Sequence, residues 1–305
     1  MIVKIIQPNN LSQFEPNKPV TFHGTADDGI VKVKLFAEQY NLSEVNVVNG
    51  NWSVSSPFNR AGKRRIIAKG FDAANNQVDT DEIDILVVET NISVLGIDVS
   101  NHNPPVDWQT VKNAKTLFAF VKATEGATYQ DPTFMRNWLG MKSVGMIRGA
   151  YHFFRPNKTP EEQVKNFLSL VQLEPSDLPP VLDIEAWPQS VGQQWKSITV
   201  EKRIQFVKAW LDQVEQRTGE KSIIYTSSSF WQEYMNDTQD FTDHHLWIAH
   251  YTSRNQPNVP ANNWGGKGYT FWQYTENGTV AGVSGNVDRN RFQGSLADLI
   301  ALANS

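Results

Sequence analysis

The sequence predicts an α/β protein with two domains, a small all-β domain over residues 1–90 and an irregular, TIM-like βα barrel over residues 91–305. Short strand patterns separated by turn signals fill the first part, which is typical of a β-sandwich. Beyond about residue 90, strand-like runs alternate with helix-like runs, as in a parallel sheet or barrel. The aromatic content changes at the same place, because only Trp52 of the ten tryptophans and only Tyr40 of the eight tyrosines lie before residue 100.

The predicted β-domain carries several strand and turn signals. Apolar residues alternate with lysines over residues 31–35 and recur at every second position over residues 83–87, as in half-buried strands. Asn49-Gly50 indicates a turn that leads into a strand. The domain resembles small bacterial immunoglobulin-like modules in three motifs that follow in the usual order: Gly24-Thr25-Ala26-Asp27, Asn49-Gly50-Asn51-Trp52 and Gly70-Phe71-Asp72. It shows no catalytic constellation, so we expect a spacer or wall-binding accessory module.

The barrel region contains alternating strand and helix patterns. Strands are expected at residues 94–99, 117–122, 146–154, 180–185, 222–226, 246–250 and 269–273. Helices are expected at residues 107–115, 133–143, 159–171, 199–217 and 295–303. The longest of them has apolar residues at helical spacing, which indicates a helix with one face in the core. The later strands lack a clear long helix between them, so the barrel is expected to be irregular in its last third.

Composition excludes several classes of function. The net charge is −4 with no basic block, which argues against nucleic acid as a partner. No apolar run approaches the length of a membrane-spanning helix, so no membrane insertion is expected. The chain has no cysteine, which excludes disulfides, thiolate metal sites and cysteine nucleophiles. The first residues lack the pattern of a signal peptide, so we expect phage-type release or specialised secretion unless a signal was removed.

The most informative motif is the apolar run 181–187, which contains Asp183 and Glu185. Side chains of a strand alternate between faces, so the two carboxyls are expected on the same face, roughly 6.5 Å apart along the strand. Two acids on one face of a buried strand are costly unless they are paired, bind a metal or transfer protons. Their separation is in the range of glycosidase acid pairs. A structural ion-pair network is the alternative.

Two further acids are expected to join this pair. In βα barrels, catalytic groups project from the carboxyl ends of the strands. Asp98 lies at such an end of the first strand, and Asp288 lies near the start of a last short strand or loop. If the barrel closes, its first and last strands are neighbours, and both acids would approach Asp183 and Glu185. The alternatives are a cap role for Asp98 and an ion pair of Asp288 with a neighbouring arginine. Acids that share a cleft repel each other, so at least one should keep its proton near neutral pH.

Eight motifs over residues 93–305 occur in the order found in glycoside hydrolase family 25, the Chalaropsis-type lysozymes, which this region resembles. The motifs are Gly96-Ile97-Asp98-Val99-Ser100, Phe120-Val121-Lys122-Ala123-Thr124-Glu125-Gly126, Gly149-Ala150-Tyr151-His152-Phe153, Leu182-Asp183-Ile184-Glu185, Ile224-Tyr225-Thr226, Leu246-Trp247-Ile248-Ala249-His250-Tyr251, Trp272-Gln273-Tyr274 and Gly282-Val283-Ser284-Gly285-Asn286-Val287-Asp288. The resemblance implies a flattened (β/α)5(β)3 barrel. It also implies cleavage of the β-1,4 bond between N-acetylmuramic acid and N-acetylglucosamine in bacterial peptidoglycan.

The resemblance also implies roles for the acids. Glu185 is the general acid, Asp183 is the second carboxylate, and Asp98 and Asp288 complete the cluster. Asp183 could attack the sugar, which needs carboxyls about 5–5.5 Å apart, or it could orient the acetamido group of the substrate as the nucleophile. We favour substrate assistance, because both sugars carry a 2-acetamido group. Glu125, in another shared motif, is expected either to contact substrate or to cap a turn.

Aromatic residues at strand ends are candidates for sugar contacts. A sugar ring offers an apolar C–H face that stacks on Trp or Tyr, while its hydroxyl groups need polar partners. The candidates are Tyr151, Tyr225, Trp247, Tyr251 and Trp272, with Gln273 as a polar contact. Each aromatic candidate has a place in the barrel core as its alternative.

The chain is therefore expected to be a peptidoglycan hydrolase, a monomer that needs no cofactor or metal and acts outside the cytoplasm at the bacterial cell wall. His244, His245 and His250 lack the spacing of a zinc site, and no serine-hydrolase elbow or phosphate loop occurs. Two alternatives stay open, a cell-wall glycan-binding protein without turnover and a hydrolase of another N-acetylated glycan such as chitin. An endolysin, an autolysin and a secreted antibacterial toxin would share this barrel.

Overall fold

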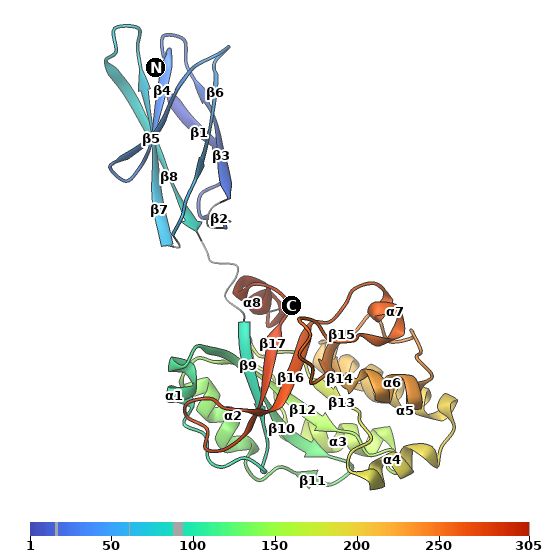
Figure 1. The fold of residues 1–305 in the computed structure, drawn as a ribbon. Helices are drawn as coiled ribbons and strands as arrows, with labels where there is room; N and C mark the ends of the chain where they lie inside the picture. Colours follow the sequence, from blue (N-terminus) through green and yellow to red (C-terminus); the bar gives the residue numbers. More distant parts are fainter. Residues whose placement is uncertain (16–17, 61, 88–93, 305) are drawn as a thin grey trace. The chain divides into compact units, whose positions relative to one another are not determined.

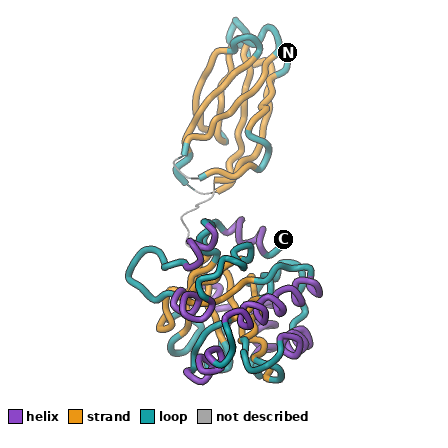
Figure 2. Tube along the Cα trace, turned by 90° about the vertical axis from the view of Figure 1, so that its right-hand side faces the viewer, coloured by secondary structure: helices purple, strands orange, loops and turns teal. Residues whose placement is uncertain are grey.

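The computed structural model describes residues 1–15, 18–60, 62–87 and 94–304, and the chain forms two compact units, Met1–Ile92 and Ser93–Ser305 (Figure 1). The predicted boundary between residues 90 and 91 lies outside the described residues. The first unit consists of strands and loops, and the second alternates strands with helices, as the tube coloured by secondary structure makes clear (Figure 2).

The N-terminal unit contains two sheets. Its strands are β1 (Val3–Gln7), β2 (Ser12–Phe14), β3 (Pro19–Ala26), β4 (Lys32–Ala37), β5 (Tyr40–Asn46), β6 (Asn51–Pro57), β7 (Gly62–Phe71) and β8 (Gln77–Val87). The sheets have the strand orders β1-β3-β6 and β2-β8-β7-β4-β5, and apolar side chains of both form one core. The turn at Asn49-Gly50 has the left-handed backbone (φ 50° and 71°) that this dipeptide favours, and it is closed by a bridge between Val48 and Asn51.

The strand patterns of this unit match the structure with one exception. Val33 and Leu35 are fully buried, as are Ile85 and Val87. Val31, within the predicted alternation, precedes β4 and is 43% exposed. Its amide is instead bonded to the carbonyl of Phe71, so the chain is still entering the sheet at this point.

The second unit is a closed barrel of eight strands. They are β9 (Val94–Val99), β10 (Thr116–Glu125), β12 (Ile147–Phe153), β13 (Val181–Asp183), β14 (Ile223–Ser227), β15 (His245–Ala249), β16 (Phe271–Gly278) and β17 (Val287–Phe292). Neighbours pair in parallel from β9 to β16, and β17 closes the barrel antiparallel to both β16 and β9. A short strand, β11 (Tyr129–Gln130), extends β10 as a hairpin.

The helices of this unit are α1 (Trp108–Asn113), α2 (Phe134–Ser143), α3 (Pro160–Leu170), α4 (Gln189–Lys196), α5 (Val200–Thr218), α6 (Ser228–Met235), α7 (Pro260–Gly265) and α8 (Leu296–Leu302). The predicted helices carry the usual end signals. Thr159 and Ser295 form capping boxes at the starts of α3 and α8, and Gly219 ends α5 in the left-handed conformation.

Sequence patterns missed α4, α6 and α7, which have only six to eight residues each and follow the fourth, fifth and sixth strands of the barrel. In α7, residues 261–264 all have φ between 54° and 56°, so this segment winds left-handed, and no periodicity rule anticipates that. The fourth strand was expected to reach Glu185 but ends at Asp183, and Glu185 stands in the loop that leads to α4.

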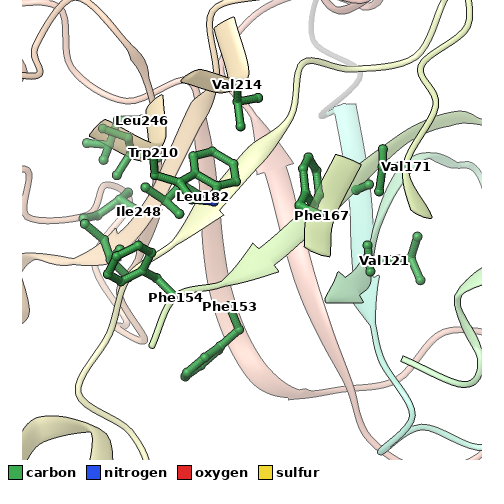
Figure 3. Packing of buried hydrophobic residues seen from close by; sticks show 14 of the residues in the cluster. Val121, Phe153, Phe154, Phe167, Val171, Leu182, Trp210, Val214, Leu246 and Ile248 are labelled. Carbon is green, nitrogen blue, oxygen red and sulfur yellow. The ribbon is translucent and has the colours of Figure 1, made fainter. Parts of the chain in front are cut away.

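The barrel has two apolar layers. Outward-facing strand residues pack against the helices, and Figure 3 shows part of this layer, with Phe167 of α3 and Trp210 of α5 beside strand residues such as Leu182. The barrel interior is filled by another cluster, which includes Phe118, Phe120 and residues of α8. Phe292, at the end of antiparallel β17, pairs with Val94 at the start of β9, so α8 closes the end of the barrel where the parallel strands begin.

Candidate active site

The four predicted acids line one cavity of about 80 Å³ at the carboxyl end of the parallel strands. Asp98 is next to last in β9, and Asp183 ends β13. Asp288 reaches the same end because β17 runs in the opposite direction, so that its first residues lie beside the last residues of β9. The rest of the lining consists of Tyr151, Tyr225, Trp247 and Gln273. Eight of the ten predicted site residues therefore meet in one place.

Asp98 and Asp288 form a carboxyl pair. They are direct partners across β9 and β17, and a hydrogen bond joins their side chains. Burial, together with the negative charge of Asp98, raises the pKa of Asp288 to about 9. Asp288 therefore keeps its proton at neutral pH and donates it in the hydrogen bond to Asp98. The arginines beside Asp288 do not pair with it, because Arg289 and Arg291 stack over the ring of Tyr274.

Neutral amides hold Asp98 in place. Its Oδ2 accepts hydrogen bonds from Asn290 Nδ2 at 2.7 Å and from Gln273 Nε2 at 2.9 Å. Burial raises the pKa of Asp98, and these two donors oppose that effect. Gln273 Oε1 in turn accepts hydrogen bonds from Tyr225 at 2.8 Å and Tyr251 at 2.7 Å, which fixes the orientation of the amide. Trp247 Nε1 donates to Asn290 Oδ1 at 2.8 Å, so the second amide is oriented as well.

Asp183 and Glu185 form the second acidic pair. Asp183 is 5% exposed, and its Oδ1 is buried without a hydrogen-bond partner among the described residues. Burial and the neighbouring charge of Glu185 raise the pKa of Asp183 well above its ordinary value. Burial also raises the pKa of Glu185 to about 7, against the opposing effect of the Lys122 ammonium group. The pair therefore holds a proton in the neutral range.

A cationic cluster lies beside the acids. Lys122 of β10 is 7% exposed, and its Nζ lies 2.5 Å from Glu125 Oε2 and 4.9 Å from the ring centre of Phe153. Arg155 donates from Nε to Glu125 Oε1 at 2.7 Å. Glu125 is thus bound on both oxygens by cations, and these contacts lower its pKa against the effect of burial. The sequence predicted that Glu125 contacts substrate or caps a turn. In the structure it forms ion pairs with Lys122 and Arg155.

The predicted aromatic contacts differ in their exposure. Trp247 is 2% exposed and stacks on Phe120 with ring centres 4.2 Å apart, so it forms the floor of the cavity. Gly149 makes room for this arrangement, since a Cβ there would lie 2.4 Å from the Phe120 ring. Tyr151 and Tyr225 flank Trp247 edge-on. Tyr251 is 47% exposed and reaches Gln273 with its hydroxyl, which leaves a free ring face at the rim.

Trp272 is not brought to the cavity. Its side chain points to the outside of the barrel, belongs to the outer apolar layer and is 3% exposed. Its Nε1 donates to the carbonyl of His250 at 2.8 Å. The strand alternation explains this, because Gln273 faces the interior and its neighbour Trp272 must face outward. Trp272 is therefore a core residue, and the predicted sugar contact there is wrong.

A second cavity, of about 300 Å³, adjoins the acidic one, and Glu185 lines both. Its other lining residues are Ala186, Trp187, Ser227, Ser229, Phe230, Glu233 and Tyr234. Trp187 is 73% exposed, the largest exposed fraction among the big apolar side chains of the described residues. A carboxyl that borders two cavities and titrates near neutrality can protonate an oxygen that bridges two parts of a ligand.

The model of the family described as glycosyl hydrolases family 25 matches residues 97–283, more than half of the chain. The chain belongs to this family. Lysozyme M1 of Streptomyces globisporus is 36% identical over 217 residues, which are 70% of this chain and 72% of that protein. The crystal structure of the bacterial lysozyme from Streptomyces coelicolor superimposes with a TM-score of 0.66 at 37% identity and covers 70% of this chain and 98% of that one. A family 25 lysozyme from Aspergillus fumigatus reaches 0.63 at 29% identity, covering 70% and 100%.

Sequence reasoning missed three contributors to the site of this family 25 domain. Asn290 lies two positions after Asp288 on a strand, and this spacing alone places both on one face. Lys122 is a lysine inside an apolar strand run, which is a signal for a functional or paired charge. Trp187 follows the acid pair directly but has no pattern of its own, because its importance depends on α4 and α6, which the sequence did not predict.

Within the described ranges, no group of three or more His, Asp or Glu side chains is arranged to hold a metal ion. Over the same ranges, no helix is long and apolar enough to cross a membrane. Of the histidines considered above, His244 is buried and hydrogen-bonded to the carbonyl of Ser222 at 2.9 Å, which is a structural role.

Proposed function

We propose that this family 25 domain is an N-acetylmuramidase that cleaves the β-1,4 bond between N-acetylmuramic acid and N-acetylglucosamine in peptidoglycan. The observation that carries the proposal is the position of Glu185, whose carboxyl borders both cavities and has its pKa raised to about 7. A glycosidic oxygen at that border is protonated as the bond breaks, and a carboxyl that is still protonated near neutral pH supplies that proton. The names of the family relatives agree with this activity.

In this proposal Glu185 is the general acid and Asp183 is the second carboxylate. The buried Oδ1 of Asp183 has no hydrogen-bond partner in the part of the chain that the structure describes, so it can accept a hydrogen bond from the N–H of the 2-acetamido group. This supports substrate assistance, in which the acetamido oxygen attacks C1 and the protein carboxylate orients it. Direct attack by Asp183 is the alternative mechanism. Trapping with a 2-fluoro sugar, which lacks the acetamido group, would label Asp183 only if the carboxylate itself attacks.

The other predicted residues position the substrate and the acids. Asp98 and Asp288 share one proton and present a single negative charge to the cavity. Tyr151 and Tyr225 are proposed to shape the sugar site around the reacting carbon, and Tyr251 offers a ring face at the rim. Trp247 forms the floor of the cavity, and Gln273 forms hydrogen bonds that connect Asp98 with Tyr225 and Tyr251. These assignments rest on the geometry of the cavity and on the chemistry of sugar rings.

The N-terminal unit is proposed to be an immunoglobulin-like accessory module, a spacer or a wall-binding element. Two packed sheets over one core support an accessory domain of this kind. The substrate places the action of the enzyme at the bacterial cell wall, outside the cytoplasm. The monomeric state stays a prediction.

The test is incubation of the wild type and of Glu185→Gln with purified peptidoglycan, followed by borohydride reduction and mass spectrometry. Muramidase action yields fragments with reduced muramic acid ends from the wild type. Glu185→Gln should release at least about 100-fold less, since general acid catalysis contributes 10²–10⁴-fold.

Other outcomes would select an alternative. Fragments that end in reduced glucosamine would mean cleavage of the other bond. No release by either protein, with both still pelleting with the wall, would mean a glycan-binding protein without turnover. Faster release from chitin oligomers than from peptidoglycan would mean another N-acetylated glycan as the substrate.

A further inference from the structure

The cavity beyond Glu185 has the construction of a sugar-binding site. Its wall consists of Phe230 and Tyr234, whose rings stack with centres 5.0 Å apart. Its polar groups stand beside these rings, with the hydroxyls of Ser227 and Ser229 bonded to each other at 3.1 Å and Glu233 paired with Lys196 at 3.0 Å. Because Phe230 and Tyr234 are 3% and 8% exposed and cover each other, a free ring face in this cavity has to come from another residue. An aromatic face combined with a few hydroxyl and carboxylate groups is typical of sites for pyranose rings, which have an apolar and a polar side.

Trp187 gives this cavity an unused aromatic face. At 73% exposed, the indole is far outside the usual range for a tryptophan in a soluble protein, because exposing so large an apolar surface is unfavourable. It stands two residues after Glu185, on the loop between β13 and α4. A single exposed aromatic residue beside a reacting carboxyl is explained if a ligand covers it.

Buried hydrogen bonds and close packing from α4, α5 and α6 hold this loop in place. Trp195 is fully buried, and its Nε1 donates to the backbone carbonyl of Glu185 at 3.0 Å. Arg203 is also buried and donates to the carbonyls of Trp195 at 2.8 Å and Tyr234 at 2.7 Å, which joins the ends of α4 and α6. A Cβ on Gly192 would lie 3.1 Å from the carbonyl oxygen of Ala186, so α4 packs closely against the loop. The Glu185 backbone and both sides of the cavity are therefore tied together.

We propose that this second cavity is the site for the leaving-group sugar, an N-acetylglucosamine ring that stacks on Trp187 with its hydroxyls toward Ser229 and Glu233. The proposal rests on the proposed muramidase activity and names the residues that recognise the sugar on the far side of the broken bond. During the step, the acetamido oxygen of the N-acetylmuramic acid bonds to C1, the C1–O bond to the leaving sugar breaks, and the O–H proton of Glu185 passes to the glycosidic oxygen, so that the N-acetylglucosamine leaves from this cavity as an alcohol. Water then bonds to C1, the bond between C1 and the acetamido oxygen breaks, and a proton of that water returns to Glu185.

The experiment compares Trp187→Ala on two soluble substrates that differ only in the leaving group. One is the tetrasaccharide of alternating N-acetylglucosamine and N-acetylmuramic acid, and the other is the β-fluoride of the disaccharide that ends in N-acetylmuramic acid, which places no sugar in the second cavity. Trp187→Ala should lower kcat/KM for the tetrasaccharide by about ten-fold or more, equivalent to about 1.4 kcal/mol. The loss on the fluoride should be at least about ten-fold smaller than the loss on the tetrasaccharide.

Two further variants sharpen the comparison. Trp187→Phe keeps an aromatic face and should recover part of the lost rate on the tetrasaccharide. Leu139→Ala removes another exposed apolar side chain, 55% exposed on α2, and should leave both rates at the wild-type level.

The outcomes separate this proposal from the proposed function. Equal losses on both substrates would mean that Trp187 acts only through the shape of the Glu185 loop, and no loss on either would mean that no sugar covers it. Both results overturn the subsite and leave the muramidase activity standing. A wild type that cleaves neither the tetrasaccharide nor peptidoglycan overturns the proposed function and the subsite with it.

Discussion

At the residue scale, the site separates its four acids into two pairs with different tasks. Asp98 and Asp288 face each other across two strands and share a proton, and their amide partners hold them in a fixed arrangement. Asp183 and Glu185 have fewer protein partners and an open side toward the second cavity. The first pair sets the charge of the cavity, and the second pair is available for the substrate.

The raised pKa of Glu185 predicts how activity and stability depend on pH. The folded-state value of about 7 lies above the ordinary value of 4.5, so folding favours the protonated form. Its contribution to stability is present below about pH 4.5 and is lost as the pH rises through about 7. Activity should fall about ten-fold per pH unit above this value, because the general acid is lost.

The variant Glu185→Gln tests the stability part of this prediction. It should raise Tm by on the order of 5 °C at pH 8 and by little at pH 4, because it removes a carboxylate that burial disfavours. Calorimetry at the two pH values measures the difference. An equal change of Tm at both would show that burial does not shift the titration of Glu185.

The shared proton of the first pair predicts different effects for two substitutions of Asp288. Asp288→Asn keeps a donor for Asp98 and should retain most of the activity at pH 6. Asp288→Ala removes the donor and leaves Asp98 ionised and less satisfied, so kcat should fall at least about ten-fold further. Steady-state rates on solubilised peptidoglycan measure this, and equal losses in both variants would contradict the donor role of Asp288.

Trp195 is predicted to act as a positioning residue for Glu185. Trp195→Phe leaves the part-buried carbonyl of Glu185 without its donor, which should cost about 1 kcal/mol of stability and lower kcat. Trp210→Phe is a matched control, because Trp210 is equally buried but its Nε1 has no hydrogen-bond partner among the described residues. Denaturant unfolding and pH–rate profiles compare them. A shifted alkaline limb of the pH–rate profile in Trp195→Phe alone would identify positioning of Glu185, and the same profile in both variants would argue for packing alone.

At the element scale, the two ends of the barrel have different roles. The carboxyl ends of the strands carry the acids, and α8 closes the opposite end with Leu299 and Ala303 in the interior core. The loop before α4 and the helices α4 and α6 form the second cavity. Both helices follow barrel strands at their carboxyl ends, β13 before α4 and β14 before α6, so they lie at the same end of the barrel as the acids.

The capping box of α8, at the closed end of the barrel, is predicted to affect the stability of the protein but not its activity. Ser295 accepts a hydrogen bond from the amide of Asp298, and the Asp298 carboxylate accepts one from the amide of Ser295. Ser295→Ala should therefore lower the free energy of unfolding by about 1 kcal/mol and leave kcat unchanged. Ser143→Ala, at the exposed end of α2, removes no helix N-cap but only an exposed hydroxyl bond to the carbonyl of Gly140, and should change the free energy of unfolding much less and kcat not at all. Urea midpoints measure the effect, and a fall in kcat would show that the closed end influences the site.

At the scale of the whole molecule, the sequence predicted the strands of the barrel and the place where the acids meet. Alternating strand and helix patterns and helical apolar spacing predicted α1, α2, α3, α5 and α8, because these features are local. Trp272 was misplaced because every aromatic residue at a strand end was taken as a candidate for sugar contact, although strand alternation sends Gln273 inward and Trp272 outward. Trp187, Trp195 and Arg203 could not be predicted, since their roles arise from contacts between α4, α5 and α6 that no local pattern encodes.

The antiparallel closing strand has a consequence for the timing of activity. Asp288 and Asn290 reach Asp98 from β17, the last barrel strand, which pairs with the first. A ribosome that has released only the strands up to β16 has made Asp183 and Glu185 but not the partners that complete the cavity. The acidic cavity can therefore form only after β17 has left the ribosome, and a product truncated before β17 should lack it.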